Sequence, residues 1–418
     1  MLENDRVKFV IHYNSDTISA NARAPLSQAE IDSLYEYVER RDADERGFLL
    51  SIVTMYELNA RWSNPIINIA VRAIGFMLKS KNDAIKYFFW GTKFKEIILG
   101  LPRHQVCVIG GPKQLIFCLK HRIPYLASMR LWGLLAQGLR DRYKEHIRKT
   151  LAKYIEEDGR KIGNKAKHGA ILIVDNDSMP MQRAMILSGR CVGLRCVCIQ
   201  DGVFQSKSPG HIMHGWFADQ FLVFNEHQKT TLVAKGMDVK KIRIMGFHSS
   251  PYSPRRPTAS PGQRRVCFLG QPWAKYGIER ANRYMEIVNK TSAILQSAGI
   301  NMTYKPHPWE FGLSHLSKVK NVVDFSLDKA FESYDVFISL TSTALIEAQA
   351  AGRVAIQLRD NQFDADDFSS HGQIVSVDLN LGEHWSEDLL SALDSPASLP
   401  GHNYPPARKF AETIEGES

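Results

Sequence analysis

FESYDVFISLTSTALIEAQAAGRVAIQLR, residues 331–359, is the stretch that decides the fold. In it the apolar run DVFIS is followed by the helical run ALIEAQAAG and then by a second apolar run, VAIQLR. A strand, a short helix and another strand in this order are typical of a β-α-β unit, whose two strands are parallel. The stretch therefore predicts a parallel sheet that is covered by helices.

The same alternation continues on both sides of this stretch. Residues 264–272 and 301–308 are predicted strands, and the helix predicted between them ends at a glycine. In the first half of the chain, the predicted strands are VCVIGG (106–111), AILIVDND (170–177) and RCVCIQDG (195–202). The sequence thus predicts an α/β protein with two Rossmann-like sheets.

The domain boundaries follow from composition. A first domain is predicted over 1–250, and its segment at about 26–101, which includes IKYFFWGTKFKEIILG, is read as a mainly helical insertion. The run HSSPYSPRRPTASPGQRR is dense in Pro, Ser and Arg and is the predicted linker to a second domain over 251–385. Residues 386–418 are predicted to form one helix and a loose tail.

Composition narrows the class of protein. The 418 residues carry a net charge of +9 and have an ordinary hydrophobic content of 44%, which favours a folded protein with an anionic partner. Neither a signal peptide nor a run of 18 apolar residues is found, so we expect a cytoplasmic protein. Lys and Arg are scattered and no nucleic-acid-binding motif is present, so nucleic acid is not expected as a partner. The cysteine spacing does not predict zinc.

Ligands of open α/β sheets bind at the carboxyl ends of the strands, which selects a short set of residues. In the first domain these are Gly110, Gly111, Asp175, Asp177 and Asp201. In the second domain they are Gln271, Lys305, His307, Ser339, Thr341, Ser342 and Thr343.

The segment YKPHP holds the most distinctive of these residues. Proline fixes its own φ and disfavours a helical conformation in the residue before it, so Pro306 and Pro308 should hold His307 on a stiff, non-helical segment. A rigid surface turn with an incidental histidine is the alternative. The successive hydroxyls of Thr341–Thr343 stand where a strand ends and a helix begins, which suits a phosphate, although one of them could simply cap the helix. Glu347, one turn further, could accept hydrogen bonds from a ribose.

IQDG ends a strand with Asp201, whose carboxylate could take a proton from an acceptor hydroxyl. The alternative is an aspartate that caps a turn. Asp175 and Asp177 form a DxD pattern, which in another class of transferase binds a metal and a nucleotide diphosphate. Ser178 and Pro180 resemble a helix start, so this pair is read mainly as a loop and an N-cap.

An acidic-Gly motif, a His-Pro motif and a Ser/Thr-rich motif, in this order over residues 105–359, resemble the metal-independent GT-B glycosyltransferases that use CMP-activated sugars. These are the bacterial sialyltransferases and polysialyltransferases and the β-Kdo transferases of capsule and O-antigen synthesis. The resemblance implies a GT-B fold, with two Rossmann-like domains facing a cleft, and a sugar acid of the Kdo or sialic acid type moved from CMP to a bacterial glycan or glycolipid. It implies no cofactor, and leaves room for peripheral contact with the inner membrane.

The resemblance also implies roles for individual residues. Asp201 corresponds to the general base of inverting members or the nucleophile of retaining ones, and His307 corresponds to the histidine that assists departure of CMP. The candidate donor-binding residues are Gln271, Lys305, Pro308, Ser339, Thr341, Ser342, Thr343 and Glu347. Sialyltransferases usually have two acids before the glycine, whereas this chain has Gln200 before Asp201, which favours a relative of that subfamily.

Three other functions fit the same motifs less well. A CDP-glycerol-type phosphotransferase also carries His-Pro and Ser-rich motifs, and a UDP-sugar enzyme of the GT-B fold would share the two sheets. A non-catalytic, basic binding module is the alternative from a different class.

Overall fold

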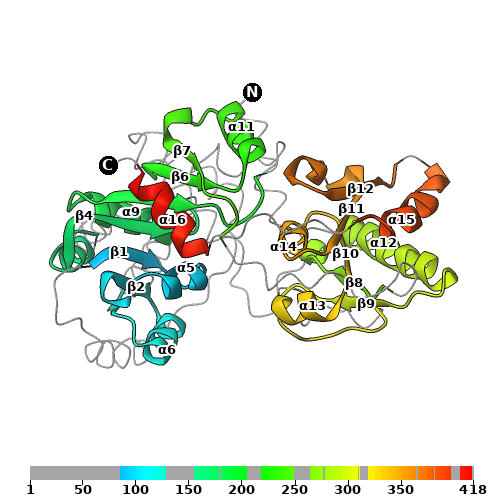
Figure 1. The fold of residues 1–418 in the computed structure, drawn as a ribbon, viewed down its shortest axis with the longest axis horizontal. Coiled ribbons are helices and arrows are strands. Elements are labelled where there is room, and N and C mark those ends of the chain that lie inside the picture. Colours follow the sequence, from blue (N-terminus) through cyan, green and yellow to red (C-terminus); the bar gives the residue numbers. More distant parts are fainter. Residues whose placement is uncertain are drawn as a thin grey trace, which may run out of the picture. The chain divides into compact units, whose positions relative to one another are not determined.

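The computed structural model describes residues 85–128, 155–177, 180–204, 218–248, 264–275, 278–308, 310, 319–363, 366–380, 382–396 and 405–416. These residues fall into two compact units. The N-terminal unit contains the described residues up to 248 together with 405–416, and the C-terminal unit contains those from 264 to 396 (Figure 1).

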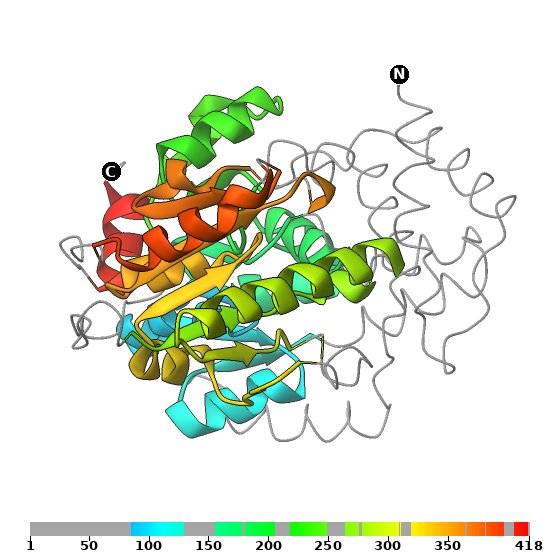
Figure 2. The same ribbon diagram turned by 90° about the vertical axis from the view of Figure 1, so that its right-hand side faces the viewer.

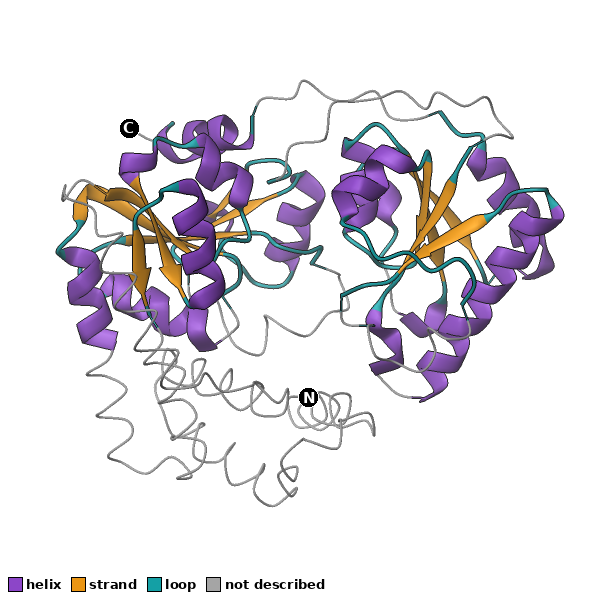
Figure 3. Cartoon of the chain, turned by 90° about the horizontal axis from the view of Figure 1, so that it is seen from below, coloured by secondary structure: helices purple, strands orange, loops and turns teal. Residues whose placement is uncertain are grey.

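The N-terminal unit is built on a seven-stranded sheet of order β3-β2-β1-β4-β5-β6-β7, in which every pair of neighbours is parallel. Its strands are β1 (Ile85–Trp90), β2 (Val106–Gly110), β3 (Tyr125–Ala127), β4 (Ala166–Val174), β5 (Arg195–Ile199), β6 (Gln220–Val223) and β7 (Ile242–Ile244). Its helices include α5 (Lys95–Gly100), α6 (Pro112–His121), α9 (Pro180–Arg190), α11 (Glu226–Ala234) and α16 (Pro406–Glu415). Two separate clusters of buried apolar side chains pack within this unit, and Figure 3 shows helices on both sides of the strands.

The C-terminal unit has a five-stranded parallel sheet of order β12-β11-β10-β8-β9. Its strands are β8 (Val266–Leu269), β9 (Met302–Lys305), β10 (Val336–Ser339), β11 (Val354–Arg359) and β12 (Ile374–Asp378). Its helices are α12 (Ile278–Ser297), α13 (Leu327–Ser333), α14 (Ala344–Ala350) and α15 (Trp385–Leu393). The long helix α12 is prominent in Figure 2 and ends before Gly299, whose φ of 75° is the left-handed conformation that glycine tolerates. The stretch that opens the analysis, residues 331–359, supplies β10, α14 and β11, as expected.

One predicted segment differs. Within the insertion expected to be mainly helical, Ile85–Trp90 is β1, a strand that pairs with β2 on one side and with β4 on the other. Its sequence, IKYFFW, is buried on both faces, so it lacks the alternation of apolar and polar residues that marks a half-buried strand. Of this segment, residues 26–84 lie outside the described part of the chain.

The end of the chain also differs from the prediction of a loose tail. Pro406–Glu415 forms α16, which packs on the N-terminal unit beside α5 (Figure 1). The Phe410 side chain is fully buried, and its ring lies 5.8 Å from that of Tyr87 and 6.0 Å from that of Phe89. The tail prediction failed because α16 covers a sheet far away in sequence. No described helix is both long and apolar enough to span a bilayer.

Candidate active site

The carboxyl ends of the C-terminal sheet bring the predicted donor-binding residues to one edge. Lys305 ends β9 and Ser339 ends β10, and β8 lies between these strands and pairs with both. Because neighbouring strands are about 4.8 Å apart, the ends of β9 and β10 are about 10 Å apart, a distance that side chains on both can bridge to a phosphate. The sheet therefore places the His-Pro segment and the hydroxyl segment on the same edge.

Gln271, just after β8, ties this edge together. Its amide Nε2 donates to Thr341 Oγ1 at 2.5 Å, and the Thr341 backbone N–H donates to Gln271 Oε1 at 2.8 Å. Trp273 Nε1 donates to the same oxygen at 3.3 Å. Gln271 and Thr341 are both buried, so their polar groups hold the loop after β10 in place.

The hydroxyl segment divides into buried and accessible residues. Ser339 is fully buried and its hydroxyl donates to the Leu269 carbonyl at 2.8 Å, so it joins β10 to β8. Ser342, Thr343 and Glu347 are only partly buried. Thr343 is the N-cap residue of α14, yet its side chain makes no capping bond, whereas Ser342 Oγ accepts from Ala344 N at 3.3 Å. Because their side chains are partly exposed, Ser342 and Thr343 are the hydroxyls of this segment that a ligand could reach.

His307 lies two residues beyond β9, on a segment that a buried glutamate holds. The carboxylate of Glu310, which is 0% exposed, accepts a hydrogen bond from the His307 backbone N–H at 2.6 Å, and Glu310 N donates to the His307 carbonyl at 2.9 Å. Pro306 is buried and Pro308 is exposed. The stiffness expected from the two prolines is thus supplemented by a closed turn around His307.

Two buried tyrosines connect this turn to Gln271. The Tyr304 hydroxyl donates to Glu310 Oε1 at 2.7 Å and lies 2.8 Å from the Tyr284 hydroxyl. The Tyr284 hydroxyl in turn accepts from the Gln271 N–H at 2.9 Å. Burial raises the pKa of both tyrosines well above the usual value, so both keep their protons. Because Tyr304 donates to Glu310, Tyr284 must donate to Tyr304, and every donor in this chain points toward the carboxylate.

Gly270 makes this arrangement possible. A Cβ at this position would lie 2.2 Å from Glu310 Oε2 and 2.6 Å from the Tyr304 hydroxyl. The backbone after β8 therefore approaches the Glu310 carboxylate more closely than any side chain would allow.

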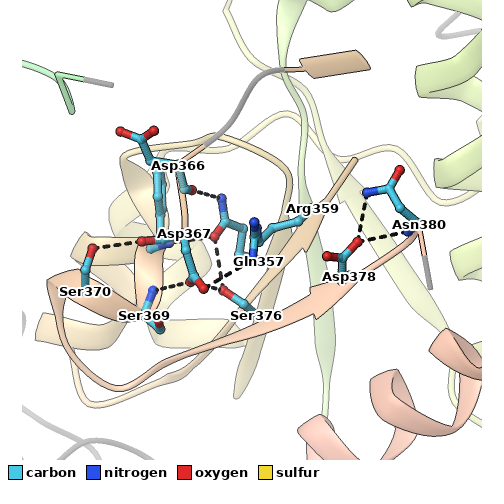
Figure 4. Close-up of polar contacts among 10 residues, drawn as sticks. Gln357, Arg359, Asp366, Asp367, Ser369, Ser370, Ser376, Asp378 and Asn380 are labelled. Atoms are coloured by element: carbon cyan, nitrogen blue, oxygen red, sulfur yellow. Dashed lines mark hydrogen bonds and ion pairs between the residues drawn. The ribbon is translucent and has the colours of Figure 1, made fainter. Parts of the chain in front are cut away.

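Acidic residues neutralise two arginines at the same edge. Arg359, the last residue of β11, pairs with Asp367 at 3.3 Å, and Asp367 also accepts from Ser376 Oγ at 2.5 Å (Figure 4). These hydrogen bonds and the arginine hold the pKa of Asp367 below its usual value despite partial burial. Arg283 pairs with the buried Asp360 at 2.7 Å. Neither arginine is therefore a strong attractor for an additional phosphate.

In the N-terminal unit, Asp201 follows β5 and is partly exposed. Its Oδ1 lies 2.6 Å from Lys93 Nζ, on the segment after β1. The preceding residue, Gln200, is buried: its Oε1 accepts from Phe224 N at 2.9 Å, and its Nε2 donates to Gly202 O at 2.8 Å and to Gln228 Oε1. The side-chain amide thus joins the backbone just after Asp201 to the backbone just after β6.

His248 is a second buried group beside Asp201. Its ring lies 4.7 Å from that of Phe247 and 4.9 Å from that of Phe94, and among the described residues nothing bonds to its Nε2. Burial lowers the pKa of His248 to about 4, although a hydrogen bond with the Asp201 backbone works in the other direction. The imidazole is therefore neutral at neutral pH.

The two acids of the DxD pattern are used by the fold. Asp175 Oδ1 accepts from Gln182 Nε2 on α9 at 3.0 Å, and burial raises its pKa. Asp177 is fully buried and accepts from Ala218 N at 3.3 Å. The helix start expected near Ser178 is observed, since α9 begins at Pro180. This supports reading the pattern as a structural loop.

Sequence reasoning missed Lys93, His248 and Glu310. Lys93 follows β1, a segment for which the sequence predicts helix, so the rule of strand ends does not select it. His248 follows the short strand β7 and could have been found by the same rule. Glu310 stands three residues after His307, at the spacing of a turn, but nothing in the sequence reveals that its side chain is buried.

Comparison with known proteins gives the fold. No family model and no curated protein matches the sequence. Among solved structures, a candidate UDP-N-acetylglucosamine 2-epimerase from Listeria monocytogenes is 13% identical with a TM-score of 0.52, and the match covers 80% of this chain and 97% of that one. The Methanocaldococcus jannaschii UDP-GlcNAc 2-epimerase is also 13% identical, with a TM-score of 0.50 and coverage of 79% and 99%. The lipopolysaccharide outer core galactosyltransferase WaaB is 12% identical, with a TM-score of 0.46 and coverage of 79% and 99%. The two parallel sheets, together with the matches at TM-scores of 0.52 and 0.50, show that the chain has the two α/β units of the GT-B fold.

Proposed function

We propose that the protein is a glycosyltransferase that moves a 2-keto sugar acid, of the Kdo or sialic acid type, from CMP to a bacterial surface glycan or glycolipid. The observation that carries this proposal is the edge of the C-terminal sheet. There a turn closed by Glu310 holds His307, and Ser342 and Thr343 lie at the same edge, partly exposed. Imidazole and hydroxyl groups suit a single phosphate.

The charge at this edge favours a nucleoside monophosphate over a diphosphate. CMP leaves as a phosphate monoester, so developing negative charge has to be stabilised on one phosphate. Lys305 and His307 are the basic residues at the end of β9, while Arg359 and Arg283 are neutralised by aspartates. The two arginines at this edge already form ion pairs with Asp360 and Asp367, so neither would neutralise the charge of a second phosphate.

In the proposed mechanism His307 donates a hydrogen bond or a proton to the departing phosphate. Asp201 acts as base for the acceptor hydroxyl, or as nucleophile if the configuration is retained. The Lys93 ammonium orients the Asp201 carboxylate, and Gln200 fixes its backbone. The mechanism uses no cofactor or metal.

The test is release of CMP from CMP-Kdo and from CMP-N-acetylneuraminate, with lipopolysaccharide fragments as acceptors and mass spectrometry of the products. We expect sugar transfer with one of these donors, and its loss in Asp201→Asn and His307→Ala. Phe331→Leu, a conservative change in a helix away from these residues, is the control that should retain activity. Turnover of UDP-sugars but not of CMP-sugars would refute the donor assignment.

A UDP-sugar enzyme is the second candidate. Two solved structures with TM-scores of at least 0.50 carry UDP-N-acetylglucosamine 2-epimerase in their names. At 13% identity this likeness shows the fold alone and does not identify the substrate. The same assay therefore has to include UDP-N-acetylglucosamine without an acceptor. An epimerised product would favour this candidate.

A further inference from the structure

We infer that Glu310 is a positioning residue for His307, and that it couples the His307 turn to the hydroxyl segment through Tyr304, Tyr284 and Gln271. The inference rests on the proposed function, because it assigns a role to a residue next to the proposed phosphate site. It adds a group that neither the motifs nor the likeness to solved structures assigns.

The first step is the cost of burying this carboxylate. Glu310 is 0% exposed, and a buried charge is strongly unfavourable unless hydrogen bonds satisfy it. The bonds from His307 N and Tyr304 Oη reach different oxygens, Oε2 and Oε1, at 2.6 and 2.7 Å. Both are short, as expected for bonds to an ionised acceptor. If the side chain served packing alone, an apolar residue would fill the same space without the free-energy cost of burying a charge.

The second step is the direction of the hydrogen bonds. Donors run from the Gln271 N–H to Tyr284, from Tyr284 to Tyr304 and from Tyr304 to Glu310. The carboxylate is the final acceptor of this chain and also accepts from the His307 N–H. Only a group that accepts at both oxygens can complete the network, and neutral glutamine cannot do so.

The third step connects the two ligand-binding segments. Gln271 bonds to the chain through its backbone N–H and to Thr341 through its side-chain amide. The same buried network therefore sets the positions of His307 after β9 and of Thr341 after β10. Displacing Glu310 should disturb both segments, and with them the geometry offered to a phosphate.

Glu310→Gln in the full chain is the first variant. The N–H₂ of the new amide would face either the His307 N–H or the Tyr304 hydroxyl, and two donors cannot bond to each other. We therefore expect at least a tenfold loss of CMP affinity in titration calorimetry. If Glu310 acts partly through His307, then Glu310→Gln combined with His307→Ala should lose less CMP affinity than the two single losses added together. Equal CMP affinity in Glu310→Gln and wild type, or full additivity, would overturn the inference.

Two further variants separate positioning from loss of folding. Tyr304→Phe removes one donor but keeps the ring, and should lower CMP affinity by a smaller factor even if Glu310→Gln does not fold. Asp335→Asn is the matched control, because Asp335 is a buried carboxylate at the opposite end of the same sheet, where it accepts from Arg265 N at 3.0 Å. It should leave CMP affinity unchanged.

A measurement that needs no nucleotide distinguishes failure of the inference from failure of the proposed function. Amide exchange of the peptide 304–310, followed by mass spectrometry, should be faster in Glu310→Gln than in wild type and unchanged in Asp335→Asn. Faster exchange together with no CMP binding by the wild type would sustain the positioning role and refute the proposed donor. Unchanged exchange would refute the positioning role whatever the ligand.

Discussion

Two side chains contact Asp201 itself, and a third fixes the backbone next to it. Lys93 contacts the carboxylate, Gln200 bridges to Gly202 and Phe224, and His248 bonds to the Asp201 backbone. A lysine that is half exposed adds little to stability, so its pairing with Asp201 matters chiefly for orientation. Gln200 has the opposite character, since it is buried and each of its amide atoms is bonded.

Gln200→Glu tests the structural role of this amide. A carboxylate could still accept from Phe224 N, but it cannot donate to Gly202 O or to Gln228 Oε1. We expect the free energy of unfolding of the N-terminal unit to fall by about 2 kcal/mol, the usual cost of unsatisfied buried groups. Urea unfolding measures this. Gln105→Glu is the control, because the contact of Gln105 with His104 is exposed, and it should leave the free energy of unfolding nearly unchanged. An equal decrease in both variants would argue against the explanation.

His248 predicts a dependence of stability on pH. Its pKa falls from 6.5 in the unfolded chain to about 4, so between these values the unfolded chain binds a proton that the native state does not. The stability that comes from keeping His248 neutral is fully present above pH 6.5 and is lost as the pH falls to about 4. The free energy of unfolding should decrease by at most about 3 kcal/mol over this range. Urea unfolding at several pH values should show this decrease.

His248→Asn is the control for that experiment, because it keeps an amide beside the Asp201 backbone but does not titrate. Lys93 and Asp201 are the charged groups that act on His248, and their effects on its pKa are opposed. The variant should show a shallower loss of stability between pH 6.5 and 4. The same slope in variant and wild type would mean that other groups cause it.

The rule that ligands bind at strand ends could predict the edge, but could not separate contact residues from supporting ones. Gln271, Ser339 and Thr341 follow strands as expected, yet all three are buried and bond to the protein. Hydroxyls and amides look the same in sequence whether they meet a ligand or a backbone carbonyl. Only the packing around each strand end decides between these roles.

At the scale of elements, α16 shows how distant segments complete a unit. The helix places Phe410 against Tyr87 and Phe89 of β1, and its last residue, Glu415, bonds to the Tyr87 hydroxyl at 2.7 Å and to Lys86. Ala407 of α16 lies opposite Gly100, where a Cβ would come within 2.6 Å of the alanine Cβ. The helix therefore covers part of one face of the sheet.

Phe410→Ala tests this contribution of α16. Because the ring is fully buried, we expect the N-terminal unit to lose about 3–5 kcal/mol of stability, as measured by denaturant unfolding. The matched change on the same helix is Arg408→Ala, since Arg408 is exposed and pairs with Glu412 one turn along the helix. That control should stay within about 0.5 kcal/mol of wild type. Similar losses in both variants would contradict the packing seen here.

Gly270→Ala tests the close approach behind β8. The new methyl group would collide with Glu310 and with the Tyr304 hydroxyl, both of which belong to the buried network. We expect a lower melting temperature and weaker nucleotide binding, both measurable by differential scanning fluorimetry. Gly299→Ala, where a Cβ would meet nothing within 4 Å but φ is 75°, should cost stability without changing nucleotide affinity. Unchanged nucleotide binding in Gly270→Ala would contradict the role of the network.

Elements were predictable where their pattern was local. The strand-helix-strand stretch 331–359 identified β10, α14 and β11, and glycine marked the end of α12. The strand β1 was missed, since IKYFFW is buried on both faces and its aromatic residues do not alternate with polar ones. The packing of α16 could not be predicted, because it depends on contacts with a sheet more than 300 residues earlier.

At the scale of the whole molecule, two parallel sheets divide the proposed chemistry. Asp201 belongs to the N-terminal unit, and His307 with the hydroxyl segment belongs to the C-terminal unit. The net charge of +9 suits an anionic nucleotide donor and an acidic glycan. The fold could be predicted because both sheets follow one alternating pattern, whereas the donor could not, since GT-B enzymes with different donors share that pattern.

The most direct measurement is the melting temperature of the full chain with CMP, CDP, UMP and UDP at equal concentrations. A ligand at 100 times its Kd stabilises the native state by about 2.7 kcal/mol, so the shifts rank the affinities. We predict the largest increase with CMP, and its loss in His307→Ala. A larger increase with UDP, or a CMP effect that survives in His307→Ala, would contradict the account.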